Sequence, residues 1–139
     1  MNGQDRVREG SAHLLLSRLR ARLEQPGLAH VRPLQAALGR GALPHEEFDR
    51  AFLVTVPGEI PDRLAALREI CSSLKPGRLL SHTEVLPDPH YQRRRTVERL
   101  AAQAGFQVAD TFGSWWAFTI NLVRPPRTCD RTGQGEQPR

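Results

Sequence analysis

The chain has 139 residues, of which 39% are hydrophobic and 25% are charged, as in a single globular domain. No apolar run approaches the roughly 18 residues of a membrane span, and the first residues lack a signal-peptide core, so we expect a cytoplasmic protein. The formal net charge is +5, but Lys75 is the only lysine among the 20 basic residues. A nucleic-acid surface usually clusters lysine with arginine, so the composition does not predict nucleic acid as a partner.

The N-terminal third is predicted to contain one helix. Residues 1–10 are polar and aperiodic, and we interpret them as a tail. Ser11 is a suitable helix N-cap, and Pro26-Gly27 would end the helix. Its apolar stripe consists of Leu16, Leu19 and Leu23. Residues 29–34 could form a short strand, although Pro33 limits it to an edge or an early end.

The middle of the chain predicts strand, helix, strand. Residues 51–56 are nearly all apolar, which is typical of a strand covered on both faces in a parallel sheet, and we place this strand at 48–56. A helix opens at Pro61-Asp62, and we expect it to end with Lys75 in its last turn and Gly77 as its cap. Residues 78–85 then form a second strand. The apolar stripe of the helix is Leu64, Leu67, Ile70 and Leu74.

The C-terminal third predicts a helix and a hairpin. The helix includes Val97 and ends at Gly105, and strands at 106–112 and 116–122 are joined too tightly for a crossover, so they are antiparallel. We expect Trp116 in the core. Residues 125–139 form a polar tail that we expect to be disordered. The whole order indicates an α/β fold with central parallel strands and a C-terminal antiparallel hairpin.

Several motifs in register resemble the class I S-adenosylmethionine-dependent methyltransferases. The most specific is FDRAFLVTVPGEIPDRLAALREICSSLKPGRLL, with TVERLAAQAGF and FGSWWAFTINLVRP after it and LLLSRLRARLEQPGLAHVRPLQA before it. The likeness spans about residues 11–124 and is nearest to the bacterial relatives of the quinone-biosynthesis enzymes. It implies a partial Rossmann-like methyltransferase domain, S-adenosylmethionine as cofactor, and a small molecule as methyl acceptor.

The resemblance also implies which part of the fold is present. The family's first strand and glycine-rich turn have no counterpart here, so we expect an N-terminally truncated domain with weak or no activity. Without that strand, residues 51–56 would lie at an exposed edge, through which the chain could pair with a second copy or a partner chain. A non-catalytic remnant that binds a partner in this way is the alternative function.

By the same resemblance, two segments would contact the cofactor. Ala36, Ala37 and Leu38 match the family's adenine loop, but Ala37 replaces a common Asp and cannot accept a side-chain hydrogen bond. The other contacts would come from Val56, Gly58 and Glu59, which follow the apolar strand at its carboxyl end, where ligands of such sheets bind. A solvated loop carboxylate is the alternative for Glu59.

Candidate substrate residues lie in and after the second strand. His82, Glu84, His90 and Tyr91 could line an acceptor pocket, with a histidine or glutamate as the base, although a structural role is favoured for each of them taken singly. Residues 93–95 are three consecutive arginines, which could bind a phosphate or carboxylate or form a solvated first helical turn. Cys71 and Cys129 are expected to be reduced, a disulfide being the alternative, and no spacing indicates a metal site.

Overall fold

A computed structural model describes residues 16–55 and 60–126. The chain divides into two units, Met1–Ala36 and Ala37–Arg139. In the first unit residues 16–23 are helical, as predicted, while the expected start at Ser11 lies outside the described residues. The strand expected at 29–34 is not formed. The Val31 N–H donates to the Leu28 carbonyl at 2.9 Å, which closes a turn, and Pro33 has no N–H to pair with a neighbouring strand.

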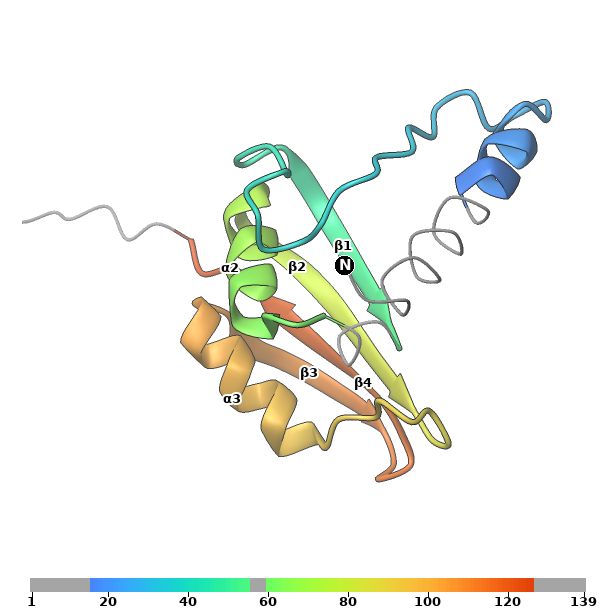
Figure 1. Cartoon of the computed structure of the whole chain (residues 1–139). Coiled ribbons are helices and arrows are strands. Elements are labelled where there is room, and N and C mark those ends of the chain that lie inside the picture. Colours follow the sequence, from blue (N-terminus) through green and yellow to red (C-terminus); the bar gives the residue numbers. More distant parts are fainter. Residues whose placement is uncertain (1–15, 56–59, 127–139) are drawn as a thin grey trace, which may run out of the picture. The chain divides into compact units, whose positions relative to one another are not determined.

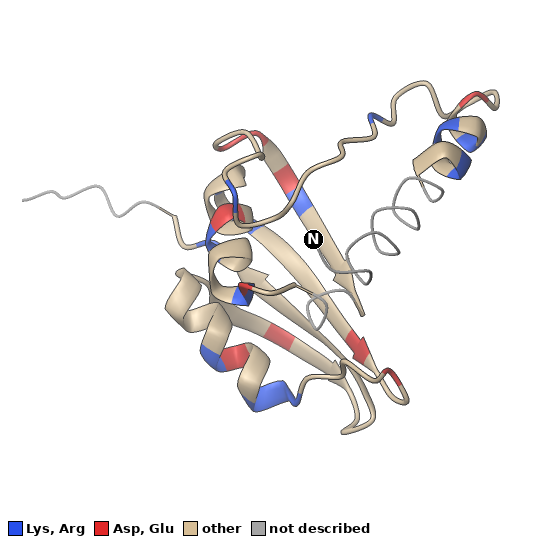
Figure 2. Ribbon diagram, in the orientation of Figure 1, with Lys and Arg blue, Asp and Glu red and all other residues tan. Residues whose placement is uncertain are grey.

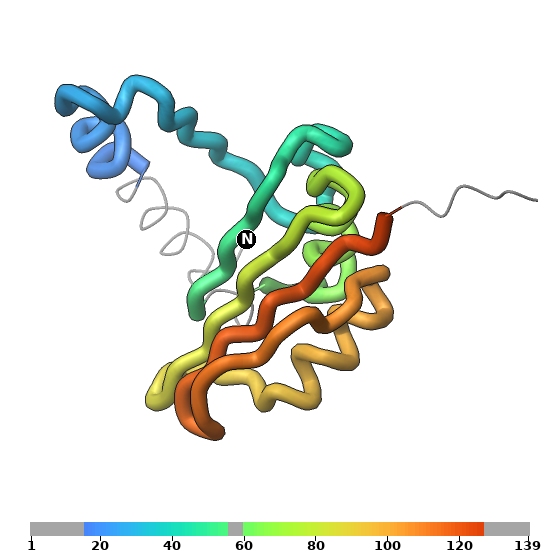
Figure 3. Tube along the Cα trace, turned by 180° about the vertical axis from the view of Figure 1, so that it is seen from behind, coloured from blue at the N-terminus to red at the C-terminus, as the bar shows by residue number. Residues whose placement is uncertain are grey.

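The second unit contains a four-stranded sheet in the order β1-β2-β4-β3. The strands are β1 (Phe48–Val54), β2 (Leu74–Val85), β3 (Gln107–Gly113) and β4 (Ala117–Val123). β1 pairs with β2 in parallel, and β4 is antiparallel to both β2 and β3 (Figures 1 and 3). The predicted α/β architecture, with parallel strands and a C-terminal antiparallel hairpin, is therefore confirmed.

Both helices of this unit, α2 (Arg63–Ser73) and α3 (Arg94–Ala104), lie on the same side of the sheet (Figure 1). Alternate residues of β2 and β4 are buried beneath them, because successive side chains of a strand point to opposite faces. Cys71 belongs to this core as a free thiol, whereas Cys129 lies outside the described residues. The core consists of Leu53, Leu67, Ile70, Cys71, Leu74, Leu80, Val97, Ala101, Ala104, Phe106, Phe118, Ile120 and Leu122.

β1 is an outer strand of the described sheet. Its only pairing partner within residues 16–55 and 60–126 is β2, and Leu53 is its single buried residue. Phe52 and Val54 are 69% and 55% exposed. The apolar segment is thus a strand, as predicted, and among the described residues its outer edge has no partner strand, as expected. It is not covered on both faces in this structure.

The segment between α2 and β2 corrects one sequence prediction. The helix ends at Ser73, and β2 begins immediately at Leu74, so Lys75 and Gly77 lie within the strand and do not close the helix. The register shifts here, since Phe48 pairs with Leu74 but Arg50 pairs with Leu79. Gly77 has a φ of +76° and donates its N–H to the Arg124 carbonyl at 2.9 Å. The Lys-Pro-Gly motif therefore forms a bulge at the start of β2.

The C-terminal elements follow the sequence prediction closely. Gly105 ends α3 in the left-handed conformation, with a φ of +99°. Trp116, however, precedes β4 and is 51% exposed, so its predicted place in the core is wrong. The hairpin turn extends one residue further than expected, which leaves Trp116 outside the strand alternation. Among the described helices, none has the length and apolar character needed to cross a membrane.

Candidate functional site

The carboxyl ends of the parallel strands lie at one edge of the sheet. β1 ends at Val54 and β2 at Val85, and Val85 is paired with Ala117 at the start of β4. The turn between β3 and β4 therefore lies at the same edge, and the Leu86 N–H donates to the Trp116 carbonyl at 2.8 Å. In open α/β sheets this is the edge at which ligands bind.

A cavity of about 920 Å³ opens at this edge, between the first turn of α3 and the β3–β4 turn. Its volume is within the range of pockets that hold small molecules. Polar donors and aromatic rings share its wall, and no carboxylate is among the lining residues. They are Leu86, Tyr91, Arg93, Arg94, Arg95, Thr96, Gly113, Ser114, Trp115 and Phe118.

Tyr91 joins the two sides of the cavity. Its hydroxyl donates a hydrogen bond to the Trp115 carbonyl, and its ring meets Phe118 edge-on, at 6.0 Å between centroids and 76° between planes. The Tyr91 N–H also donates to the Asp88 carbonyl at 3.1 Å. These contacts hold the β3–β4 turn against the loop that leads into α3, so the opening of the cavity is positioned by the fold.

Figure 2 shows basic residues at the start of α3. Three of them, Arg93, Arg94 and Arg95, line the cavity. Arg93 is the N-cap residue and makes no side-chain capping hydrogen bond. Arg94 pairs with Glu98 at 3.4 Å in an exposed contact one turn along the helix. Within the described residues, neither Arg93 nor Arg95 has a carboxylate partner, so two guanidinium groups remain available at the cavity.

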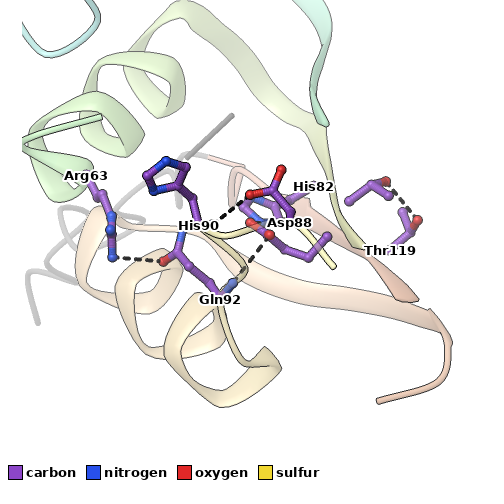
Figure 4. A network of polar contacts seen from close by, with 8 residues as sticks. Arg63, His82, Asp88, His90, Gln92 and Thr119 are labelled. Carbon is purple, nitrogen blue, oxygen red and sulfur yellow. Dashed lines mark hydrogen bonds and ion pairs between the residues drawn. The ribbon is translucent and has the colours of Figure 1, made fainter. Parts of the chain in front are cut away.

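His82 and Glu84, both on β2, form a buried pair. Figure 4 shows His82 in the network of polar contacts that also includes Gln92 and Arg63. His82 Nε2 lies 3.0 Å from Glu84 Oε1, and both residues are 1% exposed. Glu84 Oε2 accepts the backbone N–H of Gln92 at 3.4 Å, and the Gln92 side-chain oxygen accepts from Arg63 at 3.5 Å. The pair thus anchors the loop before α3 from within. Its predicted contact with substrate stays a prediction.

Only one of the four predicted substrate residues, Tyr91, lines the cavity. His90 is exposed, and its backbone N–H donates to Asp88 Oδ1 at 2.7 Å. The prediction omitted Ser114 and Trp115 from the site. A glycine-serine turn followed by an aromatic residue, after a strand that ends at this edge, was the signal that could have indicated them.

The predicted cofactor segments are placed as follows. Ala36 is exposed in the first unit; Ala37 is exposed in the second unit, and Leu38 packs against its core. Val56, Gly58 and Glu59 lie outside the described residues. Thr55, just before them, has a φ of +51°, which is unusual for a β-branched residue, and donates its N–H to the Thr83 carbonyl at 3.0 Å.

Glu69 on α2 holds the loop that follows Leu38. Its carboxylate accepts the backbone N–H groups of Gly39 and, at 2.8 Å, of Leu43. Burial alone would raise the pKa of the Glu69 carboxyl, but the N–H donors of this loop outweigh burial, and the pKa lies below its usual range. Gly39 itself has a φ of +88° and a close approach to Ala65 and Ala66, where a Cβ would lie 3.1 Å from both.

No protein-family model matches this sequence, and no curated protein matches it either. Solved structures do. A methyltransferase dependent on S-adenosylmethionine from Aquifex aeolicus aligns over 75% of this chain and 60% of its own, with 18% identity and a TM-score of 0.66. One from Methanosarcina mazei aligns over 78% and 76%, with 15% identity and a TM-score of 0.60. The [4+2]-cyclase SpnF aligns over 77% and 61%, with 16% identity and a TM-score of 0.62.

The chain therefore has the fold of the class I, S-adenosylmethionine-dependent methyltransferases. At 18% identity or less in these three cases, the likeness establishes the fold and not the reaction. One of the three proteins with this fold is named as a cyclase and not as a methyltransferase. The chain spans 60% of the length of the Aquifex protein.

Proposed function

We propose that this chain belongs to a methyltransferase that moves a methyl group from S-adenosylmethionine to a small acceptor. One observation carries the proposal: in a fold shared with methyltransferases, the cavity opens at the carboxyl end of β2. That edge is where sheets of this type bind ligands. The nearer relationship to bacterial quinone-biosynthesis enzymes, suggested by the sequence motifs, also remains a proposal.

We place the cofactor against two segments of the chain, as the family resemblance implies. Backbone groups of Ala37 and Leu38 would contact the adenine ring, and the segment after Thr55 would contact the rest. Thr55 supports this placement, because a β-branched residue with positive φ at the end of β1 is a strained conformation of the kind that occurs at ligand sites. Ala37 offers no side-chain acceptor, so we expect weaker binding than in a site that has one.

When bound, S-adenosylmethionine supplies a methyl group attached to a positively charged sulfur. The acceptor would supply a nucleophilic atom to receive that methyl group, and the electron pair of the carbon–sulfur bond would stay with the sulfur. This chain contributes orientation, because Tyr91 and the β3–β4 turn fix the shape of the acceptor cavity. A proton on the acceptor's nucleophilic atom would leave to solvent, because no histidine, aspartate or glutamate is among the described residues that line the cavity.

Calorimetric titration of the chain with S-adenosylmethionine tests the proposal. We expect saturable binding with a Kd of about 0.1 to 1 mM, which corresponds to about −4 to −5.5 kcal/mol. Adenosine, which lacks the methionine part, should bind several-fold more weakly. If the chain shows no saturable heat with S-adenosylmethionine, or binds adenosine equally well, the proposed function is wrong.

A further inference from the structure

We propose that the cavity between α3 and the β3–β4 turn binds the methyl acceptor through an oxyanion, and that the acceptor is a flat apolar molecule carrying a phosphate or carboxylate group. The inference rests on the proposed function, and it names the acceptor's chemical class. The inference does not depend on the buried His82–Glu84 pair or on the segments at Ala37 and Thr55 that are proposed to contact the methyl donor. It depends on charge, on free backbone donors and on the aromatic wall of the cavity.

The charge of the lining is entirely positive. Three consecutive arginines reach the cavity, and the ten lining residues include no aspartate or glutamate. Glu98 partly neutralises Arg94, in a pair whose side chains are 58% and 35% exposed. Neither Arg93 nor Arg95 forms an ion pair with an acidic residue within the described part of the chain. Arginine matches the geometry of phosphate and carboxylate oxygens through paired N–H donors.

Backbone donors at the same place also favour an anion. The first intrahelical bonds of α3 run to the Arg93 carbonyl from Thr96 at 2.8 Å and Val97 at 3.2 Å. Among the described residues no acceptor faces the N–H groups of Arg94 and Arg95. These groups lie at the positive end of the helix dipole, where an anion is stabilised and an arginine is disfavoured. Three arginines at this end of the helix lower its stability, and this cost favours a role for them in binding.

Aromatic and apolar groups form the rest of the wall. Phe118 is buried to 3% exposure beneath Tyr91, and Leu86 lies at the end of β2. Trp115 is 79% exposed at the opening, which is unusual for so large an apolar side chain. A flat ring could lie against these groups while its anionic substituent meets the arginines. Inorganic phosphate alone would leave the aromatic wall unused.

The location suits an acceptor and not a nucleic-acid strand. The arginines that reach the cavity are confined to one helical turn, whereas strand binding requires a positive groove that follows the backbone over several nucleotides. The cavity also opens at the edge of the sheet where β1 ends. A ring held in the cavity therefore lies at the same edge as the proposed site of the methyl donor.

Titration of the 139-residue chain, followed by tryptophan fluorescence and by thermal shift, tests the inference with four probes. They are phenyl phosphate, benzoate, inorganic phosphate and benzyl alcohol. We expect phenyl phosphate to bind at least about tenfold more tightly than either inorganic phosphate or benzyl alcohol, because it alone joins a divalent anion to a ring. Benzoate, with a single charge, should bind more weakly than phenyl phosphate and more tightly than benzyl alcohol.

Matched variants separate the site from general attraction. Replacing both Arg93→Gln and Arg95→Gln should weaken phenyl phosphate binding at least about tenfold. The control Arg68→Gln with Arg99→Gln removes the same charge from exposed positions that do not line the cavity, and should change binding less than about twofold. Trp115→Ala should weaken phenyl phosphate but leave inorganic phosphate unchanged. Since Trp115 is exposed, this variant tests the inference even if the double arginine variant misfolds.

Several results would overturn the inference. Equal affinity for phenyl phosphate and benzyl alcohol would show that the anionic group does not contribute to binding. Equal affinity for phenyl phosphate and inorganic phosphate would show that the ring does not contribute. Equal loss in the two double variants would show non-specific attraction. If S-adenosylmethionine binds but phenyl phosphate does not, this inference fails and the proposed function stands. If phenyl phosphate binds but S-adenosylmethionine does not, the methyl-transfer function fails, and with it the assignment of the cavity to a methyl acceptor.

Discussion

Glu69 shows how a single side chain supports the proposed donor site from a distance. It lies on α2, yet its carboxylate accepts backbone N–H groups of the loop just after Ala37 and Leu38. Because those donors lower the pKa of the carboxyl, its charged form is stabilised in the folded chain. The stabilisation is complete above the carboxyl pKa of the unfolded chain, about 4.3, and is lost as the pH falls through the lower folded value.

We predict that Glu69→Gln lowers the free energy of unfolding by about 1 to 3 kcal/mol at pH 7, since it removes one charged acceptor of these N–H groups. Urea unfolding followed by circular dichroism measures the change. The difference from the wild type should narrow as the pH is lowered from 7 to about 3. Glu47→Gln, an exposed control with no side-chain bond within the described residues, should change stability by less than about 0.5 kcal/mol. A difference that stays constant over this pH range would contradict the account.

Residues of this kind escape sequence-based prediction for a physical reason. The apolar stripe of α2 could be identified from its spacing, but a buried glutamate beside that stripe depends on a loop about 30 residues away in the chain. Tyr91 could be proposed for the site from its place after β2. Trp115 could not be placed by strand alternation, because the turn it belongs to lies outside the regular pairing of β3 and β4.

At the scale of elements, two glycines with positive φ set the shape of β2 and of the hairpin. Gly77 forms the bulge at the start of β2 with a φ of +76°, and nothing lies within 4 Å of the place of a Cβ. Gly113 closes the β3–β4 turn with a φ of +96°, and a Cβ there would lie 2.3 Å from the Ala117 carbonyl oxygen. At Gly77 only the backbone conformation disfavours a side chain. At Gly113 there is also no room for a Cβ.

We predict that Gly77→Ala costs about 1 kcal/mol of unfolding free energy, the penalty of a left-handed conformation less the entropy of glycine. Gly113→Ala should cost at least about 2 kcal/mol more, because the added carbon overlaps backbone. Chemical denaturation of both variants gives the comparison. Equal losses would mean that the turn can widen without cost, and that the hairpin does not hold the cavity as described.

The bulge also explains why one element boundary was misjudged. Leu-Lys-Pro-Gly has the composition of a helix end, with a cation and then a glycine, and local sequence offers no sign that the strand starts earlier. Pairing of Leu74 with Phe48 and the bond between Gly77 and Arg124 come from segments far along the chain. By contrast α3 and the hairpin, whose signals are local periodicity and Gly105, were predicted to within a residue or two.

At the scale of the whole molecule, the topology of the sheet determines the position of the proposed site more than any single residue does. The fold, with β1 and β2 parallel and a β3–β4 hairpin, is shared with two methyltransferases and a cyclase at 18% identity or less. It brings the ends of β1 and β2 and the β3–β4 turn to one edge, and the arginine turn of α3 borders the cavity there. The sequence predicted the parallel strands and the hairpin, but not that β4 lies between β2 and β3. The cavity depends on how the loop before α3 meets the hairpin.

Our central claim is that this edge is the site of methyl transfer. A ¹⁵N NMR titration of the chain with S-adenosylmethionine tests it most directly. We predict concentration-dependent shifts at the carboxyl edge, in Leu53, Thr55 and Leu86, with little change at the opposite edge, in Phe48 and Arg78. Shifts confined to the Phe48 edge, or none at ligand concentrations up to about 5 mM, several times the expected Kd, would contradict the claim.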